Sequence, residues 1–306
     1  MQLGVSAEGA KEELDLNEFE ATVTWIFGSG RSGSTWLMRL LARHPRVMAV
    51  NETGIGEHLV NLHASHDSAP RIEFARQNDL NAGRPDYFFS DEYGELWRRL
   101  LREFVLRRIH PRVATLAREA SIEAPLTVVK EPNGSHAADI ILSALPGSGL
   151  IFLVRDGRDV VDSSLASVLG DSWGKDFGGQ IDEAQRNSFL RFRASLWVFQ
   201  TEIVQRAYAA QPENRRIMLR YEDLLASPVP SLRAIMDRFG MTIGDSELEA
   251  IVEAEDFANI PAHKKGPDKP ARAATPGLWR ENLSDSEQEL VTRIMEDKLL
   301  ELGYAG

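Results

Sequence analysis

The chain of 306 residues contains no cysteine. Disulfide frameworks, thiolate zinc sites and cysteine nucleophiles are therefore excluded. A chain without disulfides suits a reducing compartment, so we expect a cytoplasmic protein.

A long apolar run is also lacking. No window approaches the roughly 18 uninterrupted apolar residues that indicate a membrane span. The first twenty residues are acidic and polar, without the basic and apolar regions of a signal peptide. We expect no membrane span, and we interpret residues 1–20 as an N-terminal leader before a single domain over 21–306.

Positive charge is in deficit, because 46 acidic residues outnumber 35 lysines and arginines and the net charge is −11. An acidic protein repels polyanions at long range, so nucleic acid is not expected as a partner. Any anionic ligand must then be held by a local cationic site.

What is present is an alternation of strand and helix patterns. Apolar, β-branched runs predict buried strands at 21–30, 47–50 and 126–130, and at the starts of 149–167 and 216–228. Helical spacing is found at 34–45, at 231–240, over most of 55–120 and in the C-terminal stretch from Ser284, where Glu287 would complete a capping box. The alternation predicts a three-layer α/β fold like that of the P-loop NTPases. Its central, mostly parallel sheet is flanked by helices, with the active site at the carboxyl ends of the strands.

One helical stretch, WRRLLREFVLRRIH at 97–110, is basic and amphipathic. The favoured interpretation is a solvated helix face. A membrane-surface or acceptor-binding face is the alternative.

The strongest local signal is GSGRSGSTW at 28–36, between a predicted strand and a predicted helix. Glycines allow backbone N–H groups to turn toward an anion, and a helix N-terminus adds partial positive charge. Hydroxyls and one arginine supply further donors. The candidate anion-binding residues are Gly30, Arg31, Ser32, Gly33, Ser34, Thr35 and Trp36.

This turn differs from the nucleoside-triphosphate P-loop. Gly28 and Gly33 have the P-loop spacing, but Ser34 stands where that loop has its lysine. No carboxylate placed to hold magnesium is evident either. A small-molecule or nucleoside kinase with a degenerate P-loop is therefore the alternative enzyme, and a non-catalytic nucleotide-binding module is the alternative without activity.

The segment FGSGRSGSTWL resembles the 5′-phosphosulfate loop of the sulfotransferases that use 3′-phosphoadenosine 5′-phosphosulfate (PAPS). The resemblance, which extends over roughly residues 22–285, implies PAPS as co-substrate, 3′-phosphoadenosine 5′-phosphate (PAP) as product, and no required metal. It implies that Arg31 holds the 5′-phosphate and the sulfuryl oxygens, and that Trp36 packs against the adenine.

A second segment, LVRDGRDVVDSSL at 153–165, is similar to the family's 3′-phosphate site. There the resemblance assigns Arg155, at a strand end, and Ser163, eight positions later, to the 3′-phosphate. The intervening Arg158 and Asp159 are interpreted as a local ion pair.

Two weaker matches follow. RYEDLLASP at 220–228 is similar to the segment that places a tyrosine near the adenine, which implies Tyr221. Residues 272–279 are similar to the C-terminal motif that closes over the 3′-phosphate, which implies Arg272 and Gly277. That motif's lysine and first glycine are replaced here by Ala273 and Ala274. Cations elsewhere in the lid segment 261–280 would have to compensate.

The general base is expected to be Glu52, at the end of the strand predicted at 47–50, which we expect next to the phosphate-loop strand. In one large branch of the family the base is a histidine that follows a strand, but the corresponding stretch here, around Lys130, has no histidine. The segment from His44 to Thr53 resembles that of other branches, in which the base is a glutamate after the second strand. Glu57 and Glu131 are the alternative bases. Lys130 matches a family lysine that would stabilise charge developing on the sulfuryl oxygens.

The acceptor is not fixed by the sequence. A hydroxyl or an amine of a small molecule, a sugar or a natural product is expected, and a homodimer is compatible with the chain. The lack of cysteines and of a membrane span fits a bacterial, small-molecule enzyme better than one of the secretory pathway.

Overall fold

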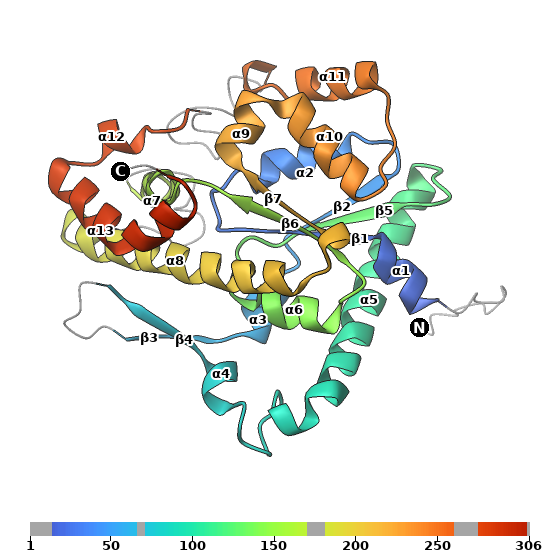
Figure 1. Ribbon diagram of the computed structural model, residues 1–306, viewed down its shortest axis with the longest axis horizontal. Coiled ribbons are helices and arrows are strands. Elements are labelled where there is room, and N and C mark those ends of the chain that lie inside the picture. The colour runs from blue at the N-terminus through green and yellow to red at the C-terminus, as the bar shows by residue number, and fades with distance from the viewer. Residues whose placement is uncertain (1–13, 66–70, 170–180, 260–274, 305–306) are drawn as a thin grey trace, which may run out of the picture.

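The computed structural model describes residues 14–65, 71–169, 181–259 and 275–304. Its centre is a sheet of five parallel strands in the order β2-β5-β1-β6-β7 (Figure 1). These strands are β1 (Val23–Phe27), β2 (Val47–Asn51), β5 (Leu126–Lys130), β6 (Gly149–Val154) and β7 (Arg216–Arg220). Four of them lie within the segments that the sequence pattern predicts as strands, and β2 extends one residue past the segment predicted at 47–50. The three-layer α/β fold is confirmed.

Helices cover both faces of this sheet (Figure 1). One face carries α2 (Ser34–Ala42), α9 (Tyr221–Ala226), α10 (Pro228–Arg238) and α11 (Asp245–Ala254). The other carries α5 (Gly94–Glu119), α6 (Ala138–Ala144), α7 (Gly157–Ala166), α8 (Arg186–Ala210) and α13 (Asp285–Glu301).

Neighbouring residues of β1 belong to different cores. Trp25 and Phe27 pack into the core on the α5–α8 side, and Ile26 between them packs into the core on the α2–α10 side. Successive side chains of a strand point to opposite faces of a sheet, so a strand covered on both sides needs apolar residues at every position. This explains why these strands are recognisable in the sequence as short continuous apolar runs.

The order of the strands corrects one expectation. Glu52 was expected beside the phosphate-loop strand, but β2 pairs with β5, and β5 lies between β2 and β1. Lys130, the last residue of β5, pairs in register with Asn51 on one side and Ile26 on the other. The intervening strand therefore places a lysine between the predicted base and the predicted phosphate turn.

The region 55–120 is less helical than its pattern predicts. A two-stranded antiparallel hairpin, β3 (Leu62–Ser65) and β4 (Glu73–Arg76), interrupts it. Its strands have only four residues each, too few for their alternation to stand out from the helical spacing around them. The helices α3 (Ile55–Leu59) and α4 (Gln77–Asn81) flank the hairpin.

Short elements complete the chain. Helix α1 (Leu16–Thr22) is capped by Asp15, whose carboxylate accepts from two backbone N–H groups, and it takes the first two positions of the strand predicted at 21–30. Helix α12 (Trp279–Asn282) precedes α13, and the predicted capping box of Ser284 and Glu287 is confirmed. The 3-10 helices of the described residues are Asp91–Tyr93, Ser135–Ala137, Glu183–Gln185, Glu213–Arg215 and Phe257–Asn259.

Candidate active site

The glycine-rich turn lies between β1 and α2, as predicted. Ser135 fixes its first residue, because its hydroxyl accepts from the Gly28 N–H at 3.0 Å and donates to the Gly28 carbonyl at 2.6 Å. Arg31 has a φ of 71°, and Gly33, the N-cap of α2, has a φ of 90°. Non-glycine residues seldom adopt positive φ, and such strain concentrates at functional sites.

Lys130 connects this turn to the predicted base. Its Nζ donates to Glu52 Oε1 at 2.6 Å and to Thr35 Oγ1 at 3.0 Å. The lysine side chain is 3% exposed, whereas that of Glu52 is 41% exposed. The cation is therefore held inside the protein, and the carboxylate that it contacts remains open to an incoming molecule.

The backbone at Glu52 has a strained conformation that hydrogen bonds hold in place. Its φ is 45°, and its N–H donates to the Lys130 carbonyl at 2.8 Å. The buried carboxylate of Glu131 accepts from the Thr53 hydroxyl at 2.7 Å and from the Gly54 N–H at 3.1 Å. Burial raises the pKa of Glu131 above its ordinary value, and the charge of Glu57 raises it further. Glu131 thus holds the turn that carries Glu52.

The two predicted cationic sites meet. Arg31 Nε donates to Ser163 Oγ at 3.0 Å, and Arg155 Nη1 donates to the Arg31 carbonyl at 3.1 Å. Arg155 directly follows β6, and Ser163 lies in the second turn of α7. The phosphate turn and the strand-end arginine therefore belong to one site, at the carboxyl ends of adjacent strands.

Tyr221 supports this site from α9. The guanidinium of Arg155 stacks over its ring at 4.6 Å from the centroid. The ring also lies so close to Gly33 that a Cβ there would approach it to 2.5 Å. Trp36 packs edge-on against Tyr221, and its indole N–H donates to the Glu255 carbonyl. Both aromatic residues predicted to lie near the adenine are thus side by side.

Several buried donors of this site have no partner among the described residues. They are Ser29 Oγ, Ser32 Oγ and Arg155 Nε. A buried polar atom without a hydrogen bond is costly, and such groups in native structures call for a ligand, a water or a functional explanation. Hydroxyl and guanidinium donors are groups that bind phosphate, so the site fits an anionic nucleotide.

The start of α7 corrects a second expectation, the Arg158–Asp159 ion pair. Arg158 instead donates three side-chain bonds to Asp156, which also caps the helix. Asp159 accepts from the Gly277 N–H at 2.8 Å, and burial raises its pKa. Residues i and i+1 of a helix point in different directions, so Arg158 and Asp159 find separate partners.

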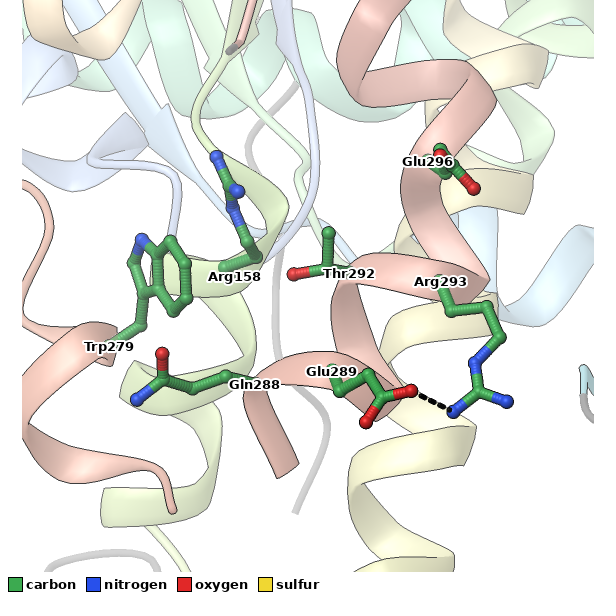
Figure 2. Close-up of a pocket in the computed structure, with 7 residues that line it drawn as sticks. All are labelled: Arg158, Trp279, Gln288, Glu289, Thr292, Arg293 and Glu296. Atoms are coloured by element: carbon green, nitrogen blue, oxygen red, sulfur yellow. Dashed lines mark hydrogen bonds and ion pairs between the residues drawn. The ribbon is translucent and has the colours of Figure 1, made fainter. Parts of the chain in front are cut away.

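The C-terminal motif docks on α7. Gly277, with a φ of 87°, places its N–H on Asp159, whereas Arg272 lies outside the described residues. Trp279 is buried, and the guanidinium groups of Arg158 and Arg280 each stack on its ring at 4.3 Å from the centroid. A shallow cavity of about 390 Å³ lies beside this stack, against α13 (Figure 2).

The sequence profile described as "Sulfotransferase family" matches residues 24–245, which is most of the chain and includes the turn, Glu52, Lys130, Arg155 and Tyr221. The chain belongs to the sulfotransferase family. Comparison of this sulfotransferase with curated protein sequences finds no match.

Solved structures resemble the sulfotransferase in fold. Mouse sulfotransferase SULT7A1 complexed with PAP is 13% identical, with a TM-score of 0.54, over 93% of this chain and 88% of that chain. Retinol dehydratase in a complex with retinol and PAP is 18% identical, with a TM-score of 0.52, over 91% and 81%. Sulfotransferase STF9 from Mycobacterium avium is 15% identical, with a TM-score of 0.52, over 91% and 76%.

Three residues that support the site of this sulfotransferase are not found by sequence reasoning. Ser135 fixes the phosphate turn from 107 positions away. Glu222 accepts from the Asp156 N–H and from the Tyr304 hydroxyl, which joins the start of α7 to the C-terminal segment. Asn133 faces Gly30, where a Cβ would approach its Oδ1 to 2.9 Å. Each acts through the tertiary fold, and only the polar run after β5 hints at two of them.

The helices of the described residues include none long and apolar enough to cross a membrane. Nor do those residues bring together three or more histidine, aspartate or glutamate side chains that could hold a metal ion.

Proposed function

We propose that the protein transfers a sulfuryl group from PAPS to a hydroxyl or amine of a small-molecule, sugar or natural-product acceptor. The observation that carries the proposal is the single site in which Arg31 contacts both Ser163 and Arg155, while Lys130 joins the same turn to Glu52. A nucleotide with phosphate groups at both ends of its ribose, and a sulfate at one of them, matches this distribution of donors.

The donor would be held mainly by the backbone N–H groups of the glycine-rich turn, with Arg31, Ser32, Gly33, Ser34 and Thr35 at its 5′ end. Arg155 and Ser163 would take the 3′-phosphate. Arg31 Nε reaches Ser163, so its guanidinium lies between the two ends of such a nucleotide. Trp36 and Tyr221 would pack against the adenine, and Gly277 with Arg272 would close the 3′ end.

The acceptor oxygen or nitrogen attacks sulfur in line with the bond to the departing phosphate, and PAP leaves. Glu52 takes the proton of the acceptor, because its carboxylate is 41% exposed and lies against Lys130 at this edge of the sheet. A positioned base contributes about 10²–10⁴-fold to the rate.

Lys130 would stabilise the charge that develops on the sulfuryl oxygens, where aligned donors have their largest effect. Before substrates bind, the Lys130 ammonium group forms an ion pair with the Glu52 carboxylate. When Lys130 turns to the sulfuryl group beside Thr35, Glu52 is released from its partner and can accept a proton. One buried cation would thus couple donor binding to activation of the base.

Transfer of ³⁵S-labelled sulfate from PAPS to a panel of hydroxyl- and amine-containing acceptors tests the proposal. Labelled product that forms together with PAP, from the wild-type protein and without ATP, is the expected result. Phosphoryl transfer from ATP with magnesium, and none from PAPS, would identify the kinase alternative instead. Binding of PAP without transfer to any acceptor, and without release of sulfate, would favour a non-catalytic module.

A further inference from the structure

Exposed apolar side chains are concentrated in one part of the molecule. Of the eight large apolar residues that are exposed in the described chain, six come from the stretch 80–104 and the other two, Met218 and Leu300, lie on β7 and α13. We use the name α5 surface for these six residues together with three exposed arginines of α5, Arg99, Arg108 and Arg112. The six apolar residues are Leu80, Phe88, Tyr93, Leu96, Leu100 and Phe104. In Figure 1, α4 and the first half of α5 form the edge of the molecule farthest from α2 and α11.

Helix α5 is apolar on two sides. Leu101, Val105 and Ile109 are buried against the sheet side of the molecule, as a core helix requires. Leu96, Leu100 and Phe104 follow one another at a spacing of four, so they form a second row on the exposed side. Phe104 is 61% exposed. The second row belongs to neither core cluster, and packing among the described residues does not explain it.

The aromatic residues before α5 are held in place. Phe88, 74% exposed, packs edge-on against Phe89 at 4.9 Å, and Phe89 packs edge-on against Trp97 at 5.4 Å. The indole N–H of Trp97 donates to the Ser90 carbonyl at 3.1 Å. The exposed ring of Phe88 is therefore supported by a chain of ring contacts that ends on α5. It is presented to the surroundings by a fixed arrangement.

The charge of α5 is opposite to that of the whole protein. The helix contains seven arginines and three glutamates, a net charge of +4, in a chain of net charge −11. Arg99, Arg108 and Arg112 are exposed, and no ion pair with another described residue involves them. Arg108 and Arg112 continue the row of Leu96, Leu100 and Phe104. A cationic, apolar row in an acidic protein selects an anionic partner that also accepts apolar side chains.

We propose that the α5 surface docks the protein on an anionic lipid bilayer as a peripheral protein. A bilayer surface offers phosphate headgroups to the arginines and an acyl boundary to Leu96, Leu100, Phe104 and Phe88, which is the combination that interfacial helices use. Trp97 and Tyr93 add amphipathic rings of the kind that concentrate at headgroup depth. The proposal does not depend on the reaction that the site catalyses.

Vesicle co-sedimentation tests the proposal with the full chain. Vesicles of phosphatidylcholine alone are compared with vesicles that contain about 30% phosphatidylglycerol, at low and high salt. We expect the wild-type protein to sediment with the anionic vesicles only, and to be released by salt because the Debye length shrinks from ~10 Å at 0.1 M to ~3 Å at 1 M.

The decisive variant is the double substitution Leu100→Glu and Phe104→Glu, matched by Met218→Glu and Leu300→Glu. Both double variants change the net charge by −2 at exposed apolar positions, but only the first lies on the α5 surface. We expect the first to lose binding by about tenfold or more and the second to bind like the wild type. Arg108→Ala with Arg112→Ala should weaken the preference for anionic vesicles.

Three results would overturn the proposal. The first is wild-type protein that ignores anionic vesicles, a result that does not depend on how any variant folds. The second is equal loss of binding in the two glutamate variants, which would assign binding to net charge alone. The third is a dimer in light scattering without lipid that Leu100→Glu and Phe104→Glu disperse, because the α5 surface would then be covered by a second copy of the chain.

Discussion

At the scale of single residues, Glu52 and Lys130 contact each other but are expected to have different roles. Glu52 is the expected base, and Lys130 is expected to stabilise charge on the sulfuryl oxygens. Glu52→Gln keeps the shape of the side chain and a carbonyl oxygen for Lys130, but it removes the proton acceptor. We expect kcat to fall by ~10²–10⁴-fold while the affinity for PAP stays nearly constant. Single-turnover sulfate transfer and calorimetry measure the two quantities. If Glu57→Gln abolished transfer and Glu52→Gln retained it, Glu57 would be the base.

Arg155 is expected to recognise the 3′-phosphate. Arg155→Ala should weaken binding of PAP by roughly 10–100-fold, the effect of losing hydrogen bonds from a charged donor, and should change binding of adenosine 5′-phosphate little. Because Arg155 also stacks on Tyr221, a thermal melt must accompany the titrations. Equal losses for the two nucleotides would show that Arg155 does not distinguish them.

Protonation of Glu131, which holds the turn at Glu52, should make the stability of the protein depend on pH. Burial raises the pKa of Glu131 in the folded protein, so the folded state binds this proton more tightly than the unfolded chain does. Its contribution to stability is complete below the unfolded pKa of about 4.3 and is lost as pH rises through the folded value. Urea denaturation should show that the free energy of unfolding of the wild type, relative to Glu131→Gln, falls over this window. A difference that is constant with pH would contradict the assignment.

At the scale of elements, the turn into α2 is limited by its glycine. Gly33 and Gly240 have φ values of 90° and 68°, but only at Gly33 would a Cβ meet another group, the ring of Tyr221 at 2.5 Å. Gly240→Ala should cost about 1–2 kcal/mol, the strain of a left-handed alanine. Gly33→Ala should cost more and should also weaken PAP binding. Urea melts and PAP titrations of both variants measure this, and equal costs with unchanged affinity would contradict it.

The elements that could be predicted are those whose pattern is local. The strands of the central sheet are continuous apolar runs because helices cover both of their faces, and the capping box at Ser284 involves neighbours in sequence. The hairpin of β3 and β4 is short and half-exposed, so no periodicity marks it. The order of the strands depends on how the crossovers pack, and no local pattern encodes that.

The site divides in the same way. Glu52, Lys130 and Arg155 could be chosen from the sequence because they match sulfotransferase motifs. The parallel strands predict that such strand-end residues meet at one edge of the sheet. Which of these side chains contact one another could not be predicted from the sequence. Lys130 reaches Glu52 because β5 separates β2 from β1, and Ser135 and Glu222 become visible only when distant segments meet.

At the scale of the whole molecule, charge is sorted by location. The chain has a net charge of −11, yet the carboxyl edge of its sheet brings together Arg31, Lys130 and Arg155, with carboxylates that are themselves paired or bonded. Such a site attracts a polyanionic nucleotide only at short range, because the rest of the protein repels it. Helix α5, with seven arginines and three glutamates, is a second cationic region outside this site.

Because this site joins loops from several strands, PAP can bind only the folded chain and should stabilise the whole domain. A ligand at 100 times its Kd adds about 2.7 kcal/mol to the free energy of unfolding. With an unfolding entropy of about 2.1 cal/mol/K per residue, a chain of this length should gain about 4 °C in Tm. Adenosine 5′-phosphate at the same concentration should give a smaller shift, and Arg155→Ala should reduce the difference between the two. Differential scanning calorimetry measures these shifts, and a wild-type Tm that PAP leaves unchanged would argue against the nucleotide site itself.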